Sequence, residues 1–365
     1  VLGGPSAEHD VSLVSGRAIA AALAERGHDI SGWLVDLDGG WWRLPAEAMS
    51  VSLEAKAFDD PQALGAVGPL VAGRALEQIR DNDPVPVVFI ALHGPFGEDG
   101  TIQALCEAAG LIYTGAGVAA SAIGMDKVLF KRLTEGMGMP SVPWITAGAA
   151  DWAADPRAVQ TRLADFARDL PDPRLVVKPS RLGSSIGISI VHHPDDAEYL
   201  GGALTDAFGY GDTALIEAYI DHPRELEMSV VGNSPADLEV FGPGEIFSGH
   251  EFYDYTAKYS DGVSETTDSA TISPQMRTRI HDLAARAFLA IGATGFARVD
   301  FMASGEDLYL NEINTIPGFT PISLFPVLCR AGGYDFGAIA ERIVELAIAR
   351  DQLSPRRVLT RADLP

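Results

Sequence analysis

Two short segments in the final quarter of the sequence carry the residues best suited to chemistry. Glu312 and Asn314 are two positions apart, as are Arg298 and Asp300, so in a strand each pair points to one face. If the two strands pair, two carboxylates, an amide and a guanidinium come together. Such oxygen ligands suit Mg²⁺ bound to a nucleotide, and an adjacent arginine can stabilise a developing oxyanion or a transferring phosphoryl group. For either strand alone, a hairpin with a polar outer face is the alternative.

A second candidate site is the turn at residues 180–187, which is rich in glycine and serine and lies between two strand-like runs. Glycines let a backbone approach phosphate oxygens, and the hydroxyls of Ser184 and Ser185 add donors. The turn lacks the Gly-Lys-Ser/Thr ending of a Walker loop, and no helix follows it, which disfavours a P-loop fold. A plain β-turn is the alternative, but Lys178 stands just before it. If the second block of the chain, residues 115–214, folds over a nucleotide, Lys127 and Lys178 lie near its phosphates; the alternative for a single lysine is simple solvation.

Three further segments could complete a ligand site. The apolar run 214–220 predicts a strand whose backbone meets an adenine edge, with Glu225 reaching the ribose; alone, it is simply a buried strand. The loops 6–10 and 93–100 follow predicted strands, where open α/β sheets bind ligands. Helix capping by Ser6 and a structural His93 are the alternative interpretations.

These segments must be positioned by an α/β framework, which we divide into three blocks. Residues 1–114 predict an open α/β domain, residues 115–214 a central block, and residues 215–365 a third block with the paired strands. The expected helices and strands are a helix at 15–26, a hairpin turn at 38–42, a parallel strand at 85–92, a helix carrying residues 125–127, strands at 175–179 and 187–191, and helices at 274–291 and 336–350.

Composition excludes several classes of protein. The 365 residues suffice for two or three domains, and 47% hydrophobic with 21% charged residues is typical of a globular chain. A net charge of -23 argues against nucleic-acid binding, so an anionic substrate must meet local cations. We expect Cys106 and Cys329 to be buried free thiols in a reducing cytosol. The sequence has no apolar run of membrane-spanning length and opens without a basic leader, which predicts a cytoplasmic protein whose natural N-terminus precedes Val1.

Ordered motifs along nearly the whole chain resemble those of the D-alanine:D-alanine ligases of the ATP-grasp superfamily. The matching segments are Gly3-Gly4-Pro5-Ser6-Ala7-Glu8, His93-Gly94 with Gly97-Glu98-Asp99-Gly100-Thr101, Tyr113-Thr114-Gly115, Met125-Asp126-Lys127, Lys178-Pro179-Ser180 with Gly183-Ser184-Ser185, Phe252-Tyr253-Asp254-Tyr255 with Lys258-Tyr259, Arg298-Val299-Asp300, and Glu312-Ile313-Asn314-Thr315 with Pro317-Gly318. The resemblance implies an ATP-grasp fold of α/β (α+β) class, with an N-terminal open α/β domain followed by central and C-terminal ATP-grasp subdomains.

The resemblance also implies a reaction. ATP phosphorylates the carboxylate of one D-alanine, and the amine of a second attacks the acylphosphate, giving D-alanyl-D-alanine, ADP and phosphate for peptidoglycan synthesis. Two magnesium ions, replaceable by manganese, are expected on Asp300, Glu312 and Asn314. The residues expected to contact ATP are Lys127, Lys178, Ser185, Glu217, Ala218, Tyr219, Ile220, Glu225 and Lys258. Position 218 departs from the basic or bulky residue of some relatives.

The remaining roles concern D-alanine. Arg298 and the N–H of Gly318 are expected to form the oxyanion site. Glu8 is expected to hold the ammonium of the first D-alanine, oriented by Ser184 and Tyr259. The other residues implied at the substrate are His93, Ser323 and Leu324, the last two at the carboxylate of the second D-alanine. The loop 247–267 is expected to close over the phosphates.

Other functions remain to be weighed. One is another ATP-grasp carboxylate:amine ligase or a D-alanyl:D-lactate ligase, which the Lys258-Tyr259 pair disfavours. A nucleotide-binding module without turnover is disfavoured by the complete set of metal and arginine residues, and a dehydrogenase by the missing Gly-x-Gly-x-x-Gly turn. We expect D-alanine and ATP as ligands, a homodimer, and no nucleic-acid or membrane partner.

Overall fold

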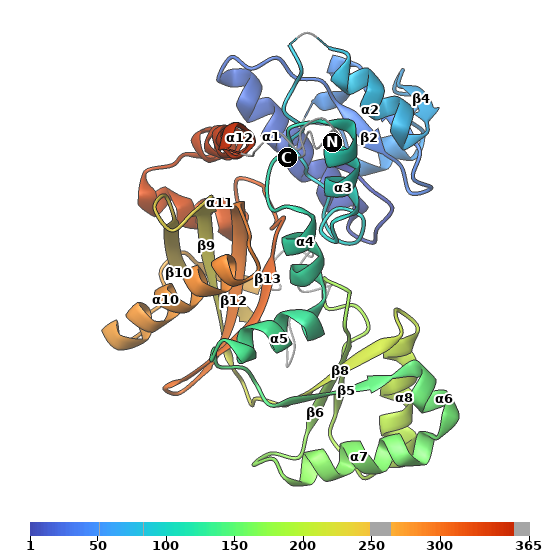
Figure 1. The fold of residues 1–365 in the computed structure, drawn as a ribbon, viewed down its shortest axis with the longest axis vertical. Helices are drawn as coiled ribbons and strands as arrows, with labels where there is room; N and C mark the ends of the chain where they lie inside the picture. The colour runs from blue at the N-terminus through green and yellow to red at the C-terminus, as the bar shows by residue number, and fades with distance from the viewer. Residues whose placement is uncertain (51, 83, 249–263, 354–365) are drawn as a thin grey trace, which may run out of the picture.

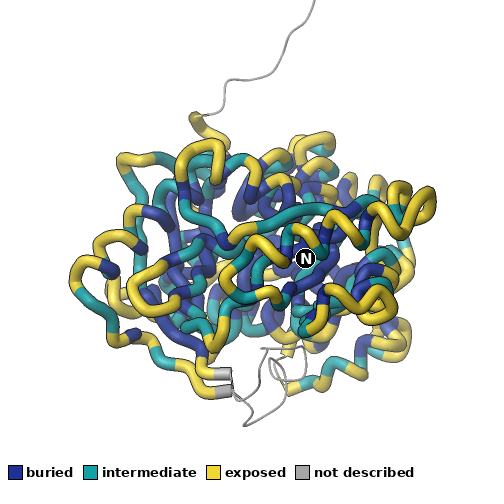
Figure 2. The backbone as a smooth tube through the Cα atoms, turned by 90° about the horizontal axis from the view of Figure 1, so that it is seen from below, coloured by how far each residue is buried: buried dark blue, intermediate teal, exposed yellow. Residues whose placement is uncertain are grey.

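The computed structural model describes residues 1–50, 52–82, 84–248 and 264–353, which form three β-sheets with helices around them (Figure 1). Buried segments run through the interior, and exposed segments lie around the rim (Figure 2). None of the described helices is long and apolar enough to cross a bilayer. Cys106 and Cys329 are buried and unpaired, as predicted.

The N-terminal part contains a four-stranded sheet in the order β1-β2-β3-β4. Its strands are β1 (Leu2–Gly3), β2 (Trp33–Val35), β3 (Trp41–Arg43) and β4 (Val67–Leu70). Its helices are α1 (His9–Glu25), η1 (Ala46–Met49), η2 (Ala55–Asp59), α2 (Ala72–Arg80) and α3 (Thr101–Ala109). The antiparallel pairing of β2 with β3 confirms the predicted hairpin turn at 38–42.

Two predictions in this part need correction. The expected parallel strand at 85–92 forms only isolated parallel bridges, Val88 to Tyr113 and Ala91 to Leu2, although its apolar residues are buried as expected. Helix α1 begins at His9 instead of residue 15, because polar residues that resembled a loop occupy its first turn. An acidic Asp10 is favourable there, since the N-terminal end of a helix carries partial positive charge.

The central sheet has the order β5-β8-β6-β7, and every described pairing in it is antiparallel. Its strands are β5 (Trp144–Gly148), β6 (Leu175–Pro179), β7 (Ser189–Val191) and β8 (Thr213–Ala218). Helices α6 (Ala149–Ala154), α7 (Pro156–Arg168) and α8 (Ala197–Phe208) pack with the sheet around one apolar core (Figure 1). Asp155 and Asp196 cap α7 and α8 with their side chains, which explains where these helices begin.

The third sheet has the order β11-β10-β9-β12-β13. Its strands are β9 (Arg224–Gly232), β10 (Glu239–Ser248), β11 (Ser264–Thr267), β12 (Gly295–Ser304) and β13 (Asp307–Asn314). The helices that follow or cover them are α10 (Pro274–Ala290), α11 (Leu324–Cys329), η3 (Arg330–Gly332) and α12 (Phe336–Leu353). Strands β12 and β13 are antiparallel, with Arg298 opposite Asn314 and Asp300 opposite Glu312, which confirms the predicted strand pair.

The helix expected to carry residues 125–127 is two helices. Helix α4 (Val118–Met125) ends before Asp126, whose side chain caps α5 (Lys127–Gly136). Its extended backbone (φ -91°, ψ 98°) prevents one continuous helix. Both helices contribute to the apolar core of the third sheet, through Ala120 and Phe130. The division at 114/115 and 214/215 stays a prediction.

The last helix returns to the first part of the chain. α12 packs on α1 in a core that includes Leu23 and Ile343. Arg350 near its end donates to the carbonyl oxygens of Tyr113, at 2.6 Å, and Gly115, and its guanidinium lies 4.4 Å from the Tyr113 ring centroid. The N-terminal part is therefore held against the third sheet, and this sets the relative position of the loops that carry the site.

Candidate active site

A cavity of about 1060 Å³ lies between the central sheet, the third sheet and the N-terminal end of α1 with its neighbouring loops. It brings together every predicted site residue that lies in the described ranges, from all three parts of the chain. These are Glu8, His93, Lys127, Lys178, Ser184, Ser185, Glu217, Ala218, Tyr219, Ile220, Glu225, Arg298, Asp300, Glu312, Asn314, Gly318, Ser323 and Leu324. Lys258 and Tyr259 lie outside the described residues, as does most of the predicted closing loop 247–267.

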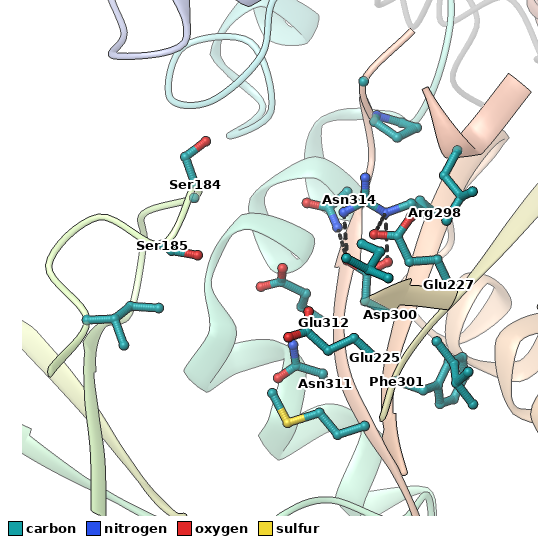
Figure 3. Close-up of a pocket in the computed structure, with 18 of the residues that line it drawn as sticks. Ser184, Ser185, Glu225, Glu227, Arg298, Asp300, Phe301, Asn311, Glu312 and Asn314 are labelled. Carbon is teal, nitrogen blue, oxygen red and sulfur yellow. Dashed lines mark hydrogen bonds and ion pairs between the residues drawn. The ribbon is translucent and has the colours of Figure 1, made fainter. Parts of the chain in front are cut away.

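One wall of the cavity is the polar face of β12 and β13 (Figure 3). Arg298 forms a two-pronged ion pair with Asp300, with both N–O distances at 2.8 Å, and lies 3.2 Å from a carboxylate oxygen of Glu227. The Asn314 amide donates to Asp300 at 2.8 Å. Burial alone would lower the pKa of Arg298, but Asp300 and Glu227 raise it well above its ordinary value. The site therefore keeps a permanent positive charge beside its acids.

Glu312, the other predicted metal ligand, is bridged by Lys127 to the turn at residues 180–187, the predicted phosphate-binding turn that we call the phosphate loop. The Lys127 ammonium lies 2.8 Å from the Glu312 carboxylate and donates to the Leu182 carbonyl oxygen at 3.1 Å. Burial would lower the pKa of Lys127, but Glu312 raises it. The lysine is thus charged in the place where phosphates are expected.

The donor set fits magnesium bound together with a nucleotide. Asp300, Glu312 and Asn314 supply two carboxylates and one amide. Among the described residues, no three histidine, cysteine or acidic side chains gather closely enough to hold a metal by themselves. Mg²⁺ keeps several waters and is commonly bound by one or two carboxylates plus substrate phosphates. The residues present therefore suit an ion that enters with ATP.

The phosphate loop lies across the cavity from this wall (Figure 3). Ser184 and Ser185 both have positive φ, 52° and 57°, a conformation that non-glycine residues seldom adopt. The Ser184 hydroxyl donates to the Glu8 carboxylate at 2.5 Å. The predicted neighbours Glu8 and Ser184 therefore meet, although 176 residues separate them in sequence.

A buried ion-pair triad is centred on Glu217, which belongs to the predicted adenine segment 214–220. The Glu217 carboxylate is 2.5 Å from the Lys178 ammonium and 2.6 Å from that of Lys131. Sequence reasoning missed Lys131, although its position four residues after Lys127 on α5 places the two lysines on one helix face. Burial would raise the pKa of Glu217, but the two lysines lower it to about 2.

This triad predicts an acid-sensitive contribution to stability. Because the folded pKa of Glu217 is depressed, its stabilisation is present above the unfolded value near 4.5 and is lost as pH falls toward 2. Lys131→Met removes one of the two cations. The free energy of unfolding should therefore fall by about 1 kcal/mol less in this variant than in wild type when the pH is lowered from 5 to 3. Urea unfolding at each pH measures this difference, with the exposed Lys56→Met as control. Equal slopes for all three proteins would contradict the assignment.

The predicted adenine segment has part of its backbone already paired. The Ala218 N–H donates to the Pro143 carbonyl at 2.8 Å, and the Tyr219 N–H donates to that of Arg174 at 3.1 Å. The Arg174 guanidinium also lies 4.1 Å from the Tyr219 ring centroid. An adenine edge at this segment would therefore meet its other backbone groups.

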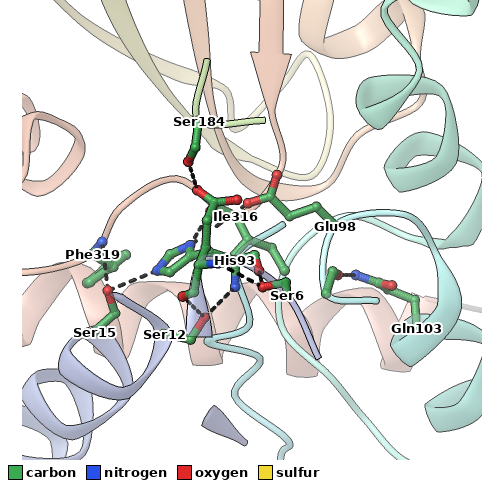
Figure 4. A network of polar contacts seen from close by, with 11 residues as sticks. Ser6, Ser12, Ser15, His93, Glu98, Gln103, Ser184, Ile316 and Phe319 are labelled. Atoms are coloured by element: carbon green, nitrogen blue, oxygen red, sulfur yellow. Dashed lines mark hydrogen bonds and ion pairs between the residues drawn. The ribbon is translucent and has the colours of Figure 1, made fainter. Parts of the chain in front are cut away.

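His93 joins the first and third parts of the chain (Figure 4). One ring nitrogen lies 2.8 Å from the Ile316 carbonyl oxygen, and the other lies 2.9 Å from the Ser15 hydroxyl. Both nitrogens are thus engaged by the protein, so the ring, which lines the cavity, joins the segment before Gly318 to α1. Glu98, which lies in a segment matching the family but had no role assigned from the sequence, lies 3.9 Å from this ring, and burial raises its pKa.

The predicted site of the second D-alanine lies at the start of α11. Ser323 precedes that helix, and its hydroxyl accepts a hydrogen bond from the Thr320 N–H at 3.0 Å. Ser323 and Leu324 line the cavity, and a Cβ at Gly318 would lie 3.4 Å from the Ser323 hydroxyl oxygen. A turn therefore collects a hydroxyl and backbone groups next to the predicted oxyanion site.

Comparison with known proteins extends these observations. The family model "D-ala D-ala ligase N-terminus" matches residues 1–116, and "D-ala D-ala ligase C-terminus" matches residues 133–345. A curated D-alanine–D-alanine ligase of Deinococcus radiodurans is 40% identical over 95% of this chain and 96% of its own length. One of Geobacillus thermodenitrificans is 37% identical, over 96% of this chain and 94% of its own.

Solved structures agree with the sequence relatives. The D-alanine-D-alanine ligase of Coxiella burnetii superposes with a TM-score of 0.79 at 30% identity, covering 96% of this chain and 93% of its own. The VanG D-Ala:D-Ser ligase of Enterococcus faecalis superposes with a TM-score of 0.78 at 28% identity, covering 95% and 97%. Fold and site together define an ATP-grasp enzyme.

Within that class the chain belongs to the D-alanine–D-alanine ligase family. The predicted family, fold and enzyme class, an ADP-forming ligase, are confirmed.

Proposed function

We propose that the protein joins two molecules of D-alanine at the expense of ATP, giving D-alanyl-D-alanine, ADP and phosphate by way of a D-alanyl phosphate, for peptidoglycan synthesis. The observation that carries this proposal is the meeting of Glu8 and Ser184 in the cavity that also holds Arg298, Asp300 and Glu312. An anchor for an ammonium group thus shares the cavity with Arg298, which can meet phosphate and carboxylate oxygens, and with acids that would hold magnesium when it is bound.

The first step transfers the γ-phosphoryl group to a carboxylate oxygen of the first D-alanine and breaks its bond to the β-phosphate, which releases ADP. Lys127 and Lys178 would offset the charge of the phosphates, and the amides and hydroxyls of Ser184 and Ser185 would cover them. Magnesium held by Asp300, Glu312 and Asn314 would neutralise phosphate oxygens when bound.

In the second step, the unprotonated amine of the second D-alanine attacks the carbonyl carbon. The carbonyl oxygen becomes an oxyanion, phosphate leaves, and the nitrogen loses a proton. Arg298 and the Gly318 N–H are the donors proposed for that oxyanion. Glu8 would fix the first ammonium, while Ser323 would bind the carboxylate of the second D-alanine.

The direct test is ADP release in the presence of ATP and one amino acid at a time. D-alanine alone should support rapid release, and the product should be D-alanyl-D-alanine. Release with L-amino acids or another acceptor, and none with D-alanine, would favour a different ATP-grasp ligase. ATP binding without release under any substrate would favour a module without turnover.

We further predict that dipeptide strongly dominates over D-alanyl-D-lactate at pH 7. This expectation rests on Lys258-Tyr259, which lie outside the described residues. Tyr259→Phe should raise the ester fraction by at most about 10- to 100-fold, as for the loss of one hydrogen bond. Competition between D-alanine and D-lactate at pH 6, 7 and 8, with products separated by chromatography, measures this ratio. Abundant ester from wild type at pH 7 would contradict it.

Three finer features belong to the same proposal. Two magnesium ions, replaceable by manganese, a homodimer and a cytoplasmic location are proposed from the family resemblance. The two buried free thiols, Cys106 and Cys329, agree with a reducing compartment.

A further inference from the structure

Asp126, between α4 and α5, gathers more donors than a helix cap requires. One carboxylate oxygen accepts the N–H groups of Val128 and Leu129, both at 3.1 Å, which caps α5. The same oxygen accepts the Ser180 hydroxyl at 2.7 Å, and the other accepts Nε of Arg181 at 2.7 Å. Two of these four donors come from the start of the phosphate loop, 54 and 55 residues further along the chain.

The backbone reinforces this junction. The Lys127 N–H donates to the Ser180 carbonyl oxygen at 2.9 Å, so the first residue of α5 also holds the base of the loop. The Asp126 side chain is only 8% exposed, whereas that of its partner Arg181 is 67% exposed. Burial would raise the pKa of Asp126, but Ser180 and Arg181 lower it, so the carboxylate is charged at neutral pH.

The loop needs such an anchor because its shape is not one that the chain adopts readily. Ser184 and Ser185 both occupy the left-handed region, which non-glycine residues enter only when their surroundings hold them there. Further contacts hold the loop beyond its base, from Lys127 to the Leu182 carbonyl and from Ser184 to Glu8.

We propose that Asp126 is a positioning residue that anchors the phosphate loop in its nucleotide-binding conformation; this inference rests on the proposed ATP-dependent ligase function. A loop that populates its binding conformation only part of the time binds with an affinity reduced by that fraction. Asp126 acts through Ser180 and Arg181, and ATP affinity is therefore the quantity that it controls.

The test uses Asp126→Asn, Arg181→Met and the double variant of the full chain. Each single variant should raise KM for ATP about tenfold, with kcat at saturating ATP within about threefold of wild type. Because Arg181 acts only through Asp126, the double variant should be no worse than the more impaired single variant. The Kd of ADP, measured by calorimetry without D-alanine, should rise in parallel.

Two controls separate anchoring from general damage. Arg168→Met removes an arginine that is as exposed as Arg181, at 67%, and that lies 2.7 Å from Asp165. That pair lies on the surface of α7, away from the phosphate loop. The KM of this variant for ATP should therefore stay at the wild-type value. Asp126→Ser keeps a helix cap but no charge, so it should retain the unfolding midpoint while KM rises.

An unchanged KM and ADP Kd for Arg181→Met would overturn the proposal, and so would independent, multiplying effects in the double variant. Arg181 is exposed, so its loss does not threaten the fold. Trypsin cleavage after Arg181 in the absence of nucleotide should be faster in Asp126→Asn than in wild type. If wild type binds ADP but makes no dipeptide, the proposed function fails, and the ADP affinities still decide the role of Asp126.

Discussion

Glu312→Gln is expected to lower turnover about 10²- to 10³-fold while leaving the free energy of unfolding nearly unchanged. The change removes a full negative charge from the proposed metal site, where electrostatic stabilisation of the transferring group is usually the largest contribution. The amide oxygen of Gln can still accept from Lys127, whose ammonium also keeps its bond to the Leu182 carbonyl oxygen, so no buried group loses all its partners and the fold should tolerate the change.

The measurement is ADP release at saturating ATP and D-alanine over a range of magnesium concentrations, together with urea unfolding without ligands. Glu306→Gln, in the exposed turn between β12 and β13, is the matched control and should behave as wild type. Asp300→Asn should resemble Glu312→Gln in activity. Turnover within tenfold of wild type in Glu312→Gln would rule out this residue as a metal ligand.

The second large effect concerns Arg298, whose loss should impair both catalysis and stability. Arg298→Met leaves the carboxylates of Asp300 and Glu227, which are 13% and 7% exposed, without their cation. Breaking a buried ion pair from one side costs about 3–5 kcal/mol, and removing an oxyanion donor costs about 10²- to 10³-fold in kcat. Arg298→Lys keeps the charge but loses the two-pronged geometry, so it should lie between wild type and Arg298→Met.

A second substitution separates the two consequences. Adding Glu227→Gln to Arg298→Met removes one of the stranded carboxylates, so the unfolding midpoint should recover while turnover stays low. Thermal unfolding and ADP release on the same samples give both readings. Parallel recovery of stability and activity would mean that Arg298 has a structural role only.

Local sequence rules predicted the parts of the site that lie close together along the chain. The two-residue spacing of Arg298 with Asp300, and of Glu312 with Asn314, was sufficient to predict one polar face on a strand pair. The turn at 180–187 was predicted to bind phosphate from its local composition, because glycine and serine favour close backbone approach to anions.

The supporting contacts could not be predicted in this way, because they join distant segments. Lys131 meets Glu217 across 86 residues, and His93 meets the Ile316 carbonyl across 223. Neither residue has a neighbour in sequence that marks its partner, and only the docking of sheets and helices brings them together. Similarly, the interruption between α4 and α5 at Asp126 coincides with the docking of the phosphate loop, through Ser180 and Arg181, and helix propensity does not predict it.

The packing of α12 on α1 has a consequence for synthesis on the ribosome. Part of the apolar surface of α1, including Ile19 and Leu23, is covered by α12, and roughly 310 residues must be translated between the end of one helix and the start of the other. At 5–20 residues per second this interval is roughly 15 to 60 s. Throughout it, the nascent N-terminal part displays Ile19 and Leu23 without their final partners, which makes it a substrate for chaperones that capture apolar surfaces during translation.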